Sequence, residues 1–270
     1  MGNVWDAMKK HADEQAKEKP PEDAASSQQQ PAAPIARKSA QTAARPAGNS
    51  YSPVLVTYHD PGGMLAEQYR CLRTNALAHS PQQRLCTIIT SAEIGEGKTV
   101  TCLNLAFVLA ELPDVRVMVI DADLRKSNLT TLLRSQKTPG FADLLRGTCM
   151  LKDVIQPTLC PNLDVISAGA VKRGELGEVL SRFQMTEIIY ELRRQYPCIL
   201  FDTPPVNAVS DAGVLGRTVG EAMLVVRMHR TTRESVDRAV GLLHAADVKI
   251  TGMFLTHQKE YVPRYLEYYY

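Results

Sequence analysis

The fold is decided by residues 86–99, which read CTIITSAEIGEGKT. The apolar run Cys86–Ser91 is predicted to form a strand, and Lys98–Glu111 carries apolar residues at helical spacing. A glycine-rich loop joins the two and ends in GKT at residues 97–99. A strand, such a loop and a helix in this order form a Walker A loop, which binds phosphate at the N-terminus of the helix.

The residue types in this loop suit phosphate binding. Gly95 and Gly97 permit positive φ and a close approach of the backbone to phosphates. Lys98 supplies positive charge, and the Thr99 hydroxyl is a Mg²⁺ ligand. The predicted ligands are therefore ATP and Mg²⁺, and the predicted nucleotide-binding residues are Gly95, Glu96, Gly97, Lys98, Thr99 and Val100. Ala92 stands where the strict pattern has glycine, so the alternative is a glycine-rich turn with a chance lysine.

Two other apolar strands end in carboxylates. Arg116–Asp121 leads into Asp123, and Cys198–Asp202 leads into Thr-Pro-Pro. Carboxylates at the ends of buried parallel strands lie where ligands bind in open α/β sheets. The predicted catalytic residues are Lys98, Asp121, Asp123 and Asp202, and the predicted metal ligands are Thr99, Asp121 and Asp202.

The aspartates two positions apart are expected to have different roles. On an extended strand Asp121 and Asp123 would point in opposite directions, unless the strand has already ended. One can serve the metal and the other the attacking hydroxyl or water. The alternative for either residue is that it caps the following turn.

The remaining pattern indicates an α/β fold with a mostly parallel sheet covered by helices on both faces, because uniformly apolar strands alternate with helices. Further predicted strands are Leu163–Ser167, Glu221–Met228 and Lys249–Leu255, and further predicted helices are Gln184–Gln195 and Ser235–Ala246.

Composition divides the chain into three parts. Residues 1–50 are rich in Pro, Ala, Gln and Ser and are predicted to be a disordered N-terminal segment, with Trp5 and Met8 on a short solvated or docking helix. Residues 51–260 form the P-loop domain, and residues 261–270 form a tail with five of the ten tyrosines. The net charge of +2 does not favour nucleic acid, and no apolar run is long enough to span a bilayer.

Four patterns together resemble the bacterial tyrosine kinases (BY-kinases) within the ParA/MinD branch of P-loop ATPases, over about residues 60–270. The first is residues 67–75, EQYRCLRTN, similar to the family's oligomerisation helix. The others are the Walker A loop, residues 121–125 (DADLR), and residues 202–205 (DTPP) followed by 209–212 (VSDA). Two loop departures are Ile94 in place of proline and the lack of the family's usual prolines in residues 170–178.

The resemblance implies a protein-tyrosine autokinase that regulates capsule or exopolysaccharide synthesis and export. It implies a homo-oligomeric ring in which one subunit phosphorylates its neighbour's tail. The implied phosphoacceptors are Tyr261, Tyr265, Tyr268, Tyr269 and Tyr270, and the implied oligomer interface is formed by Glu67, Arg70 and Arg73. It also implies a cytoplasmic protein held at the inner face of the cell membrane by a separate transmembrane chain-length regulator that activates it.

Alternatives remain for these features. Glu67, Arg70 and Arg73 could form a solvated face of i,i+3 ion pairs. The tyrosine run could be an interaction or aggregation segment. The whole chain could be an ATPase switch of the ParA/MinD kind, although Glu93 replaces that group's signature lysine, or a binding module with a degenerate site. The arginines at 227, 230 and 233 could meet phosphate or solvent.

Overall fold

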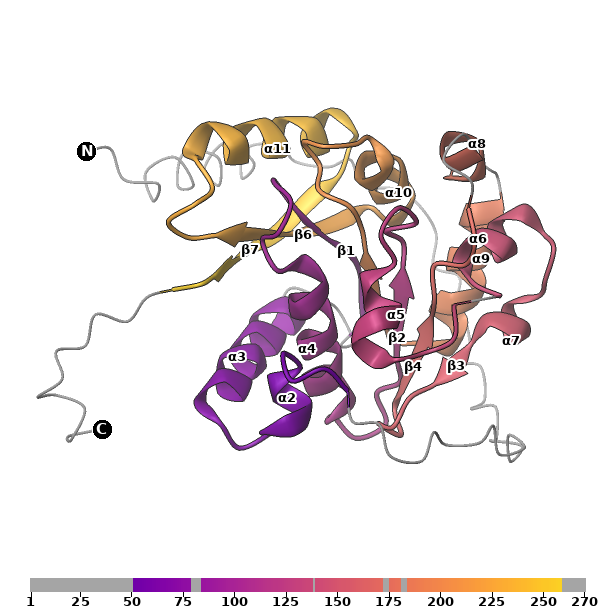
Figure 1. The fold of residues 1–270 in the computed structure, drawn as a ribbon, viewed down its shortest axis with the longest axis horizontal. Helices are drawn as coiled ribbons and strands as arrows, with labels where there is room; N and C mark the ends of the chain where they lie inside the picture. The colour runs from indigo at the N-terminus through magenta and orange to yellow at the C-terminus, as the bar shows by residue number, and fades with distance from the viewer. Residues whose placement is uncertain (1–50, 79–83, 138, 172–174, 181–183, 259–270) are drawn as a thin grey trace, which may run out of the picture. The chain divides into compact units, whose positions relative to one another are not determined.

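The computed structural model describes residues 51–78, 84–137, 139–171, 175–180 and 184–258. Its centre is a seven-stranded sheet with the order β3-β4-β2-β5-β1-β6-β7 (Figure 1). All neighbouring strands are parallel except β3 and β4, which pair antiparallel. The strands are β1 (Leu85–Ser91), β2 (Val117–Asp121), β3 (Gln156–Pro157), β4 (Leu163–Ile166), β5 (Cys198–Asp202), β6 (Glu221–Arg227) and β7 (Lys249–Thr256).

Helices cover both faces of the sheet (Figure 1). One face packs against α2 (Val56–His59), α3 (Met64–Ala78), α4 (Lys98–Ala110) and α5 (Asn128–Leu133). The other face packs against α6 (Phe141–Arg146), α7 (Leu151–Val154), α8 (Leu176–Leu180), α9 (Gln184–Gln195), α10 (Asp211–Val219) and α11 (Arg233–Ala245). Because side chains alternate along a strand, neighbours such as Ile88 and Ile89 enter opposite cores.

The predicted fold class is confirmed. All strands that the sequence predicted are present within about two residues of their expected ends. The sequence did not predict the short helices α5 to α8, the antiparallel edge strand β3, or α10. Short helices give too few turns for a periodic apolar pattern, and their positions depend on packing against the sheet.

The sheet register sets the acidic residues beside one another. Asp121 ends β2 and lies directly opposite Asp202, which ends the adjacent strand β5. On the other side of β5, Asp202 lies opposite Ile89 of β1, two residues before that strand enters the glycine-rich loop. The site is therefore built at the carboxyl edge of the three central strands. Among the described helices, none has both the length and the apolar character that crossing a bilayer requires.

Candidate active site

The glycine-rich loop has the backbone that its sequence predicted. Gly95 and Gly97 have φ values of 83° and 94°, in the left-handed region, where residues with a Cβ are strained. A Cβ on Gly97 would lie 3.6 Å from the Thr256 side chain, an ordinary contact, so the backbone angle is what requires glycine. Helix α4 begins at Lys98, so the loop amides and the first turn of the helix face the same place.

Three buried carboxylates surround the Lys98 ammonium. Its Nζ lies 3.0 Å from Oδ2 of Asp123 and 3.8 Å from Oδ1 of Asp202. Asp121 and Asp202 are fully buried, and Asp123 is 1% exposed. Strand β2 ends at Asp121, so Asp123 is already outside the extended strand and the two aspartates do not point apart as a continuous strand would require. The structure thus brings together all four predicted catalytic residues.

The protonation of this cluster reflects burial and crowding of charge. Burial, with the nearby charges of Asp202 and Asp123, holds the pKa of Asp121 well above its usual value. Burial also raises the pKa of Asp202 to about 6, although the Lys98 charge opposes the shift. For Lys98, burial alone would lower the pKa, but the carboxylates of Asp202 and Asp123 outweigh it and the pKa is raised. The lysine therefore keeps its charge at neutral pH.

The residues present fit a magnesium ion. Both oxygens of Asp121, both oxygens of Asp202 and Oδ1 of Asp123 are buried and accept no hydrogen bond within the described part of the chain. Buried carboxylate oxygens without a hydrogen-bond donor are available to a cation, which would favour their ionised form. The described residues form no cage of three or more metal ligands. Mg²⁺ needs no such cage, because it binds through one or two carboxylates and fills its shell with water and phosphate oxygens.

Glu93, at the position of the missing signature lysine, bonds within its own chain. Its Oε1 accepts hydrogen bonds from the hydroxyl of Ser235 (2.5 Å) and from Nδ2 of Asn207 (3.3 Å). Ser235 lies in the first turn of α11, and Asn207 lies in the loop before α10. The carboxylate therefore holds the start of the phosphate loop to these two segments, a role that the sequence did not reveal because the partners are distant along the chain.

Comparison with known proteins identifies the family of this chain. The sequence profile of the AAA domain family matches residues 87–225. Tyrosine-protein kinase YwqD of Bacillus subtilis is 34% identical over 206 residues, which span 76% of this chain and 86% of YwqD. The chain belongs to the bacterial tyrosine-protein kinases.

Solved structures agree with this assignment. The kinase domain of the Escherichia coli tyrosine kinase ETK superposes with a TM-score of 0.71 at 30% identity, covering 80% of this kinase and 86% of that domain. The septum site-determining protein MinD of Pyrococcus horikoshii, complexed with Mg-ADP, gives a TM-score of 0.55 at 25% identity over 67% of this kinase and 74% of MinD. The kinase spans 28% of the length of some longer relatives, such as the putative tyrosine-protein kinase EpsB of Ralstonia nicotianae.

The kinase ties its second acidic motif to α10 through an ion pair. Nε and Nη2 of Arg125 donate to the two carboxylate oxygens of Asp211, at 2.8 and 3.1 Å. Arg125 follows the aspartate pair by two residues, and Asp211 is the first residue of α10. Both residues were noted in the sequence as parts of separate motifs, and the structure shows that they form one two-pronged contact.

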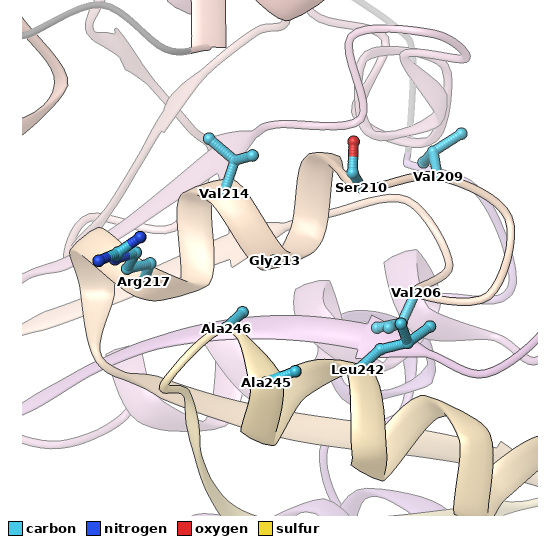
Figure 2. Close-up of a pocket in the computed structure, with 9 residues that line it drawn as sticks. All are labelled: Val206, Val209, Ser210, Gly213, Val214, Arg217, Leu242, Ala245 and Ala246. Atoms are coloured by element: carbon cyan, nitrogen blue, oxygen red, sulfur yellow. The ribbon is translucent and has the colours of Figure 1, made fainter.

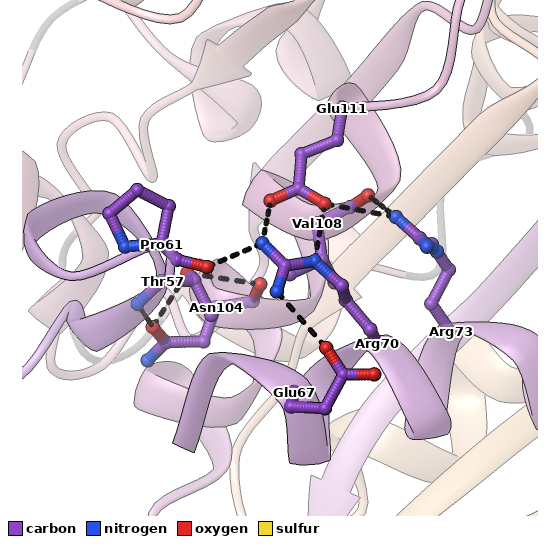
Figure 3. Close-up of polar contacts among 8 residues, drawn as sticks. All are labelled: Thr57, Pro61, Glu67, Arg70, Arg73, Asn104, Val108 and Glu111. Carbon is purple, nitrogen blue, oxygen red and sulfur yellow. Dashed lines mark hydrogen bonds and ion pairs between the residues drawn. The ribbon is translucent and has the colours of Figure 1, made fainter. Parts of the chain in front are cut away.

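The α3 arginines of the kinase contact α4 (Figure 3). Arg70 donates to both carboxylate oxygens of Glu111, at 2.9 and 2.8 Å, and to Glu67 at 3.2 Å. Arg73 donates to the Val108 carbonyl (2.6 Å) and to Glu111 (3.1 Å). The i,i+3 pair of Glu67 and Arg70 exists, but both arginines also fasten α3 to the C-terminal end of α4. Neither sequence-based interpretation included Glu111.

Two predicted features lie elsewhere. The five phosphoacceptor tyrosines and the N-terminal segment fall outside the described residues. A hollow of about 310 Å³ lies between α10 and α11 (Figure 2). It contains none of the predicted site residues, and only one of its side chains is charged. Its lining consists of Val206, Val209, Ser210, Gly213, Val214, Arg217, Leu242, Ala245 and Ala246. This lining is mostly aliphatic and contains no carboxylate that could bind Mg²⁺.

Proposed function

We propose that this kinase transfers the γ-phosphate of ATP to tyrosines of its own C-terminal tail, the tail of one subunit serving the site of its neighbour. The observation that supports the proposal is that the last strand, β7, ends beside the phosphate loop. The Thr256 hydroxyl, at the end of β7, donates to the Glu96 carbonyl of the phosphate loop at 2.8 Å. The first tail tyrosine, Tyr261, follows five residues later, a span of at most about 18 Å.

Different site residues would bind the phosphates, hold the metal ion and accept the proton of the tyrosine. The loop amides and Lys98 bind the phosphates, and a Mg²⁺ ion held by Thr99, Asp121 and Asp202 would supply positive charge on the transferring phosphoryl group. A tyrosine hydroxyl has a pKa of about 10, so it needs an acceptor for its proton. A carboxylate of the Asp121 and Asp123 pair accepts it. Binding and positioning provide most of the rate enhancement.

Phosphorylation of the tail would control assembly. Each phosphotyrosine adds about 1.5 to 2 negative charges, and neighbouring phosphates repel one another. Modified tails would therefore leave their neighbours' sites and loosen a ring whose interface includes Glu67, Arg70 and Arg73. By resemblance, the process served is capsule or exopolysaccharide synthesis and export. A transmembrane chain-length regulator would recruit the kinase to the membrane and activate it.

The test is incubation of the purified full chain with Mg·ATP, followed by mapping of phosphotyrosine by mass spectrometry. The parallel variants are Lys98→Met, which removes the phosphate-binding charge, and Lys152→Met, an exposed lysine on α7. We expect phosphate within Tyr261–Tyr270 for the wild type and Lys152→Met, and none for Lys98→Met.

Three other results would contradict the proposal. ATP hydrolysis with an unmodified tail would favour the ATPase switch, in which nucleotide state drives partner binding without tyrosine phosphorylation. Tail phosphate that persists in Lys98→Met would mean that another kinase made it. If the purified chain alone is inactive, the assay is repeated with the regulator's cytoplasmic part, and inactivity there as well rejects the proposal.

A further inference from the structure

Glu96 stands inside the phosphate loop, yet its side chain is turned away from solvent and is 1% exposed. A buried carboxylate is costly unless donors surround it. This one accepts hydrogen bonds from the backbone amide of Glu93 (2.7 Å), the backbone amide of Arg227 (3.2 Å) and the Thr231 hydroxyl. Its three donors satisfy it without a metal or a ligand.

These partners come from different parts of the fold. The amide of Glu93 belongs to the phosphate loop itself, so that bond fixes the internal shape of the loop. Arg227 is the last residue of β6, and Thr231 lies just before α11. The backbone carbonyl of Glu96 also accepts from Thr256 at the end of β7. One residue thus joins the phosphate loop to the edge of the sheet that leads to the C-terminus.

The loop needs such an anchor. Glycines with positive φ lie on both sides of Glu96, and glycine gives the chain more conformational freedom than any other residue. Phosphate binding by backbone amides depends on their being oriented before the ligand arrives. Fixing residue 96 between the two glycines restricts the loop to one arrangement and sets the direction in which Lys98 leaves it.

We propose that Glu96 is a positioning residue: its carboxylate holds the phosphate-loop amides and Lys98 in their binding orientation and makes that orientation depend on the β6–α11 turn, while its backbone carbonyl joins the loop to the end of β7. Glu96 acts through the loop and does not touch the phosphates with its side chain. The inference rests on nucleotide binding as proposed above, but not on the identity of the phosphate acceptor.

The test is calorimetric titration of the full chain with Mg·ADP, together with KM and kcat for ATP in the autophosphorylation assay. For Glu96→Ala we expect nucleotide affinity to fall, and KM to rise, by about tenfold or more, since buried hydrogen bonds to a charged group are strong. Thr231→Val and Thr256→Val each remove one hydroxyl donor and should weaken binding by about two- to fivefold. The matched control is Thr251→Val, elsewhere on β7. The Thr251 hydroxyl donates to the Ala222 carbonyl of β6, and the nucleotide affinity of this variant should be unchanged.

Separate measurement of KM and kcat distinguishes a positioning role from a merely structural one. A structural defect lowers the active fraction, which lowers kcat at unchanged KM. The inference is overturned if Glu96→Ala unfolds at the wild-type temperature and binds Mg·ADP within about twofold of wild type, or if only kcat falls. If Glu96→Ala does not fold, Thr231→Val decides: affinity equal to that of Thr251→Val overturns the inference.

The titration also separates this inference from the proposed function. If the wild type binds Mg·ADP but phosphorylates no tail tyrosine, the kinase proposal fails, while the affinity of the Glu96 and Thr231 variants still tests positioning.

Discussion

Replacing Asp202 by asparagine should stabilise the metal-free kinase. The Asp202 side chain is fully buried, neither oxygen accepts a hydrogen bond within the described part of the chain, and its pKa is raised to about 6 from 3.8. A carboxyl group with a raised pKa in the folded state binds protons more tightly there than in the unfolded chain. Folding is therefore penalised at any pH where the group must ionise, and the penalty is complete above pH 6.

The size of the effect follows from the shift. A rise of about two pKa units corresponds to about 3 kcal/mol. This shift already includes the attraction of Lys98, whose Nζ lies 3.8 Å from Oδ1 of Asp202, and Lys98 keeps Asp123 at 3.0 Å in the variant, so most of this value remains. A net gain of about 2 kcal/mol would raise the melting temperature by about 4–8 °C for a domain of this size.

The assay is thermal unfolding with EDTA at pH 7.5 and at pH 4.5. The gain should shrink at the lower pH, because Asp202 is then largely protonated in the folded wild type. Asp164→Asn is the control with the opposite sign, since Asp164 accepts from Arg116 at 2.7 Å and from the Tyr196 hydroxyl at 2.8 Å. With Mg²⁺ and nucleotide the order should reverse, because only the wild type gains full binding energy. A lower melting temperature for Asp202→Asn at pH 7.5, or a gain that does not change with pH, would refute this reasoning.

Three further outcomes follow from local contacts. Gly216→Ala should lower the melting temperature, because the added Cβ would lie 2.9 Å from the Val248 side chain. Gly241→Ala on α11 meets nothing within 4 Å and should add about 1 kcal/mol of helix stability. Equal melting temperatures for the two variants would contradict this. Glu111→Gln should destabilise the fold at pH 7, because hydrogen bonds from Arg70 lower the pKa of Glu111. This stabilisation is lost as pH falls through the lowered pKa. The melting temperatures of wild type and variant should therefore differ at pH 7 and converge toward pH 3. Asp123→Asn should slow tail phosphorylation by about 10²-fold or more, measured by quantitative mass spectrometry, with equal rates arguing that Asp123 neither positions Lys98 nor accepts a proton.

The sequence predicted the central part of the fold well. Strands such as Cys86–Ser91 are buried on both faces, so they consist of apolar runs that stand out from their surroundings. The phosphate loop could also be predicted, because its residue types are required by backbone angles and by phosphate charge. The carboxyl ends of parallel strands lie at one edge of a sheet, so the strand assignments placed Asp121 and Asp202 at the same edge, but only the structure shows that their strands are neighbours.

The support around the site could not be predicted. Glu96 bonds to residues more than 130 positions away, and Arg70 bonds to Glu111, 41 positions away. Such contacts depend on how helices and turns pack against the sheet, and local sequence patterns do not determine that packing. One signal was nevertheless present: a glutamate between two glycines of a phosphate loop places negative charge beside phosphates, which is unfavourable unless donors turn it away from them.

The two loop glutamates indicate how this site differs from one that needs a second subunit's lysine. A cation at position 93 can act on phosphates across a dimer, whereas a carboxylate there would repel them. Here Glu93 is bound to Ser235 and Asn207, and Glu96 to the β6–α11 turn. Both negative charges are thereby occupied by donors of the same chain. The phosphate loop takes its shape from its own subunit, and in the proposed reaction the neighbour's role is only to supply the group that is phosphorylated.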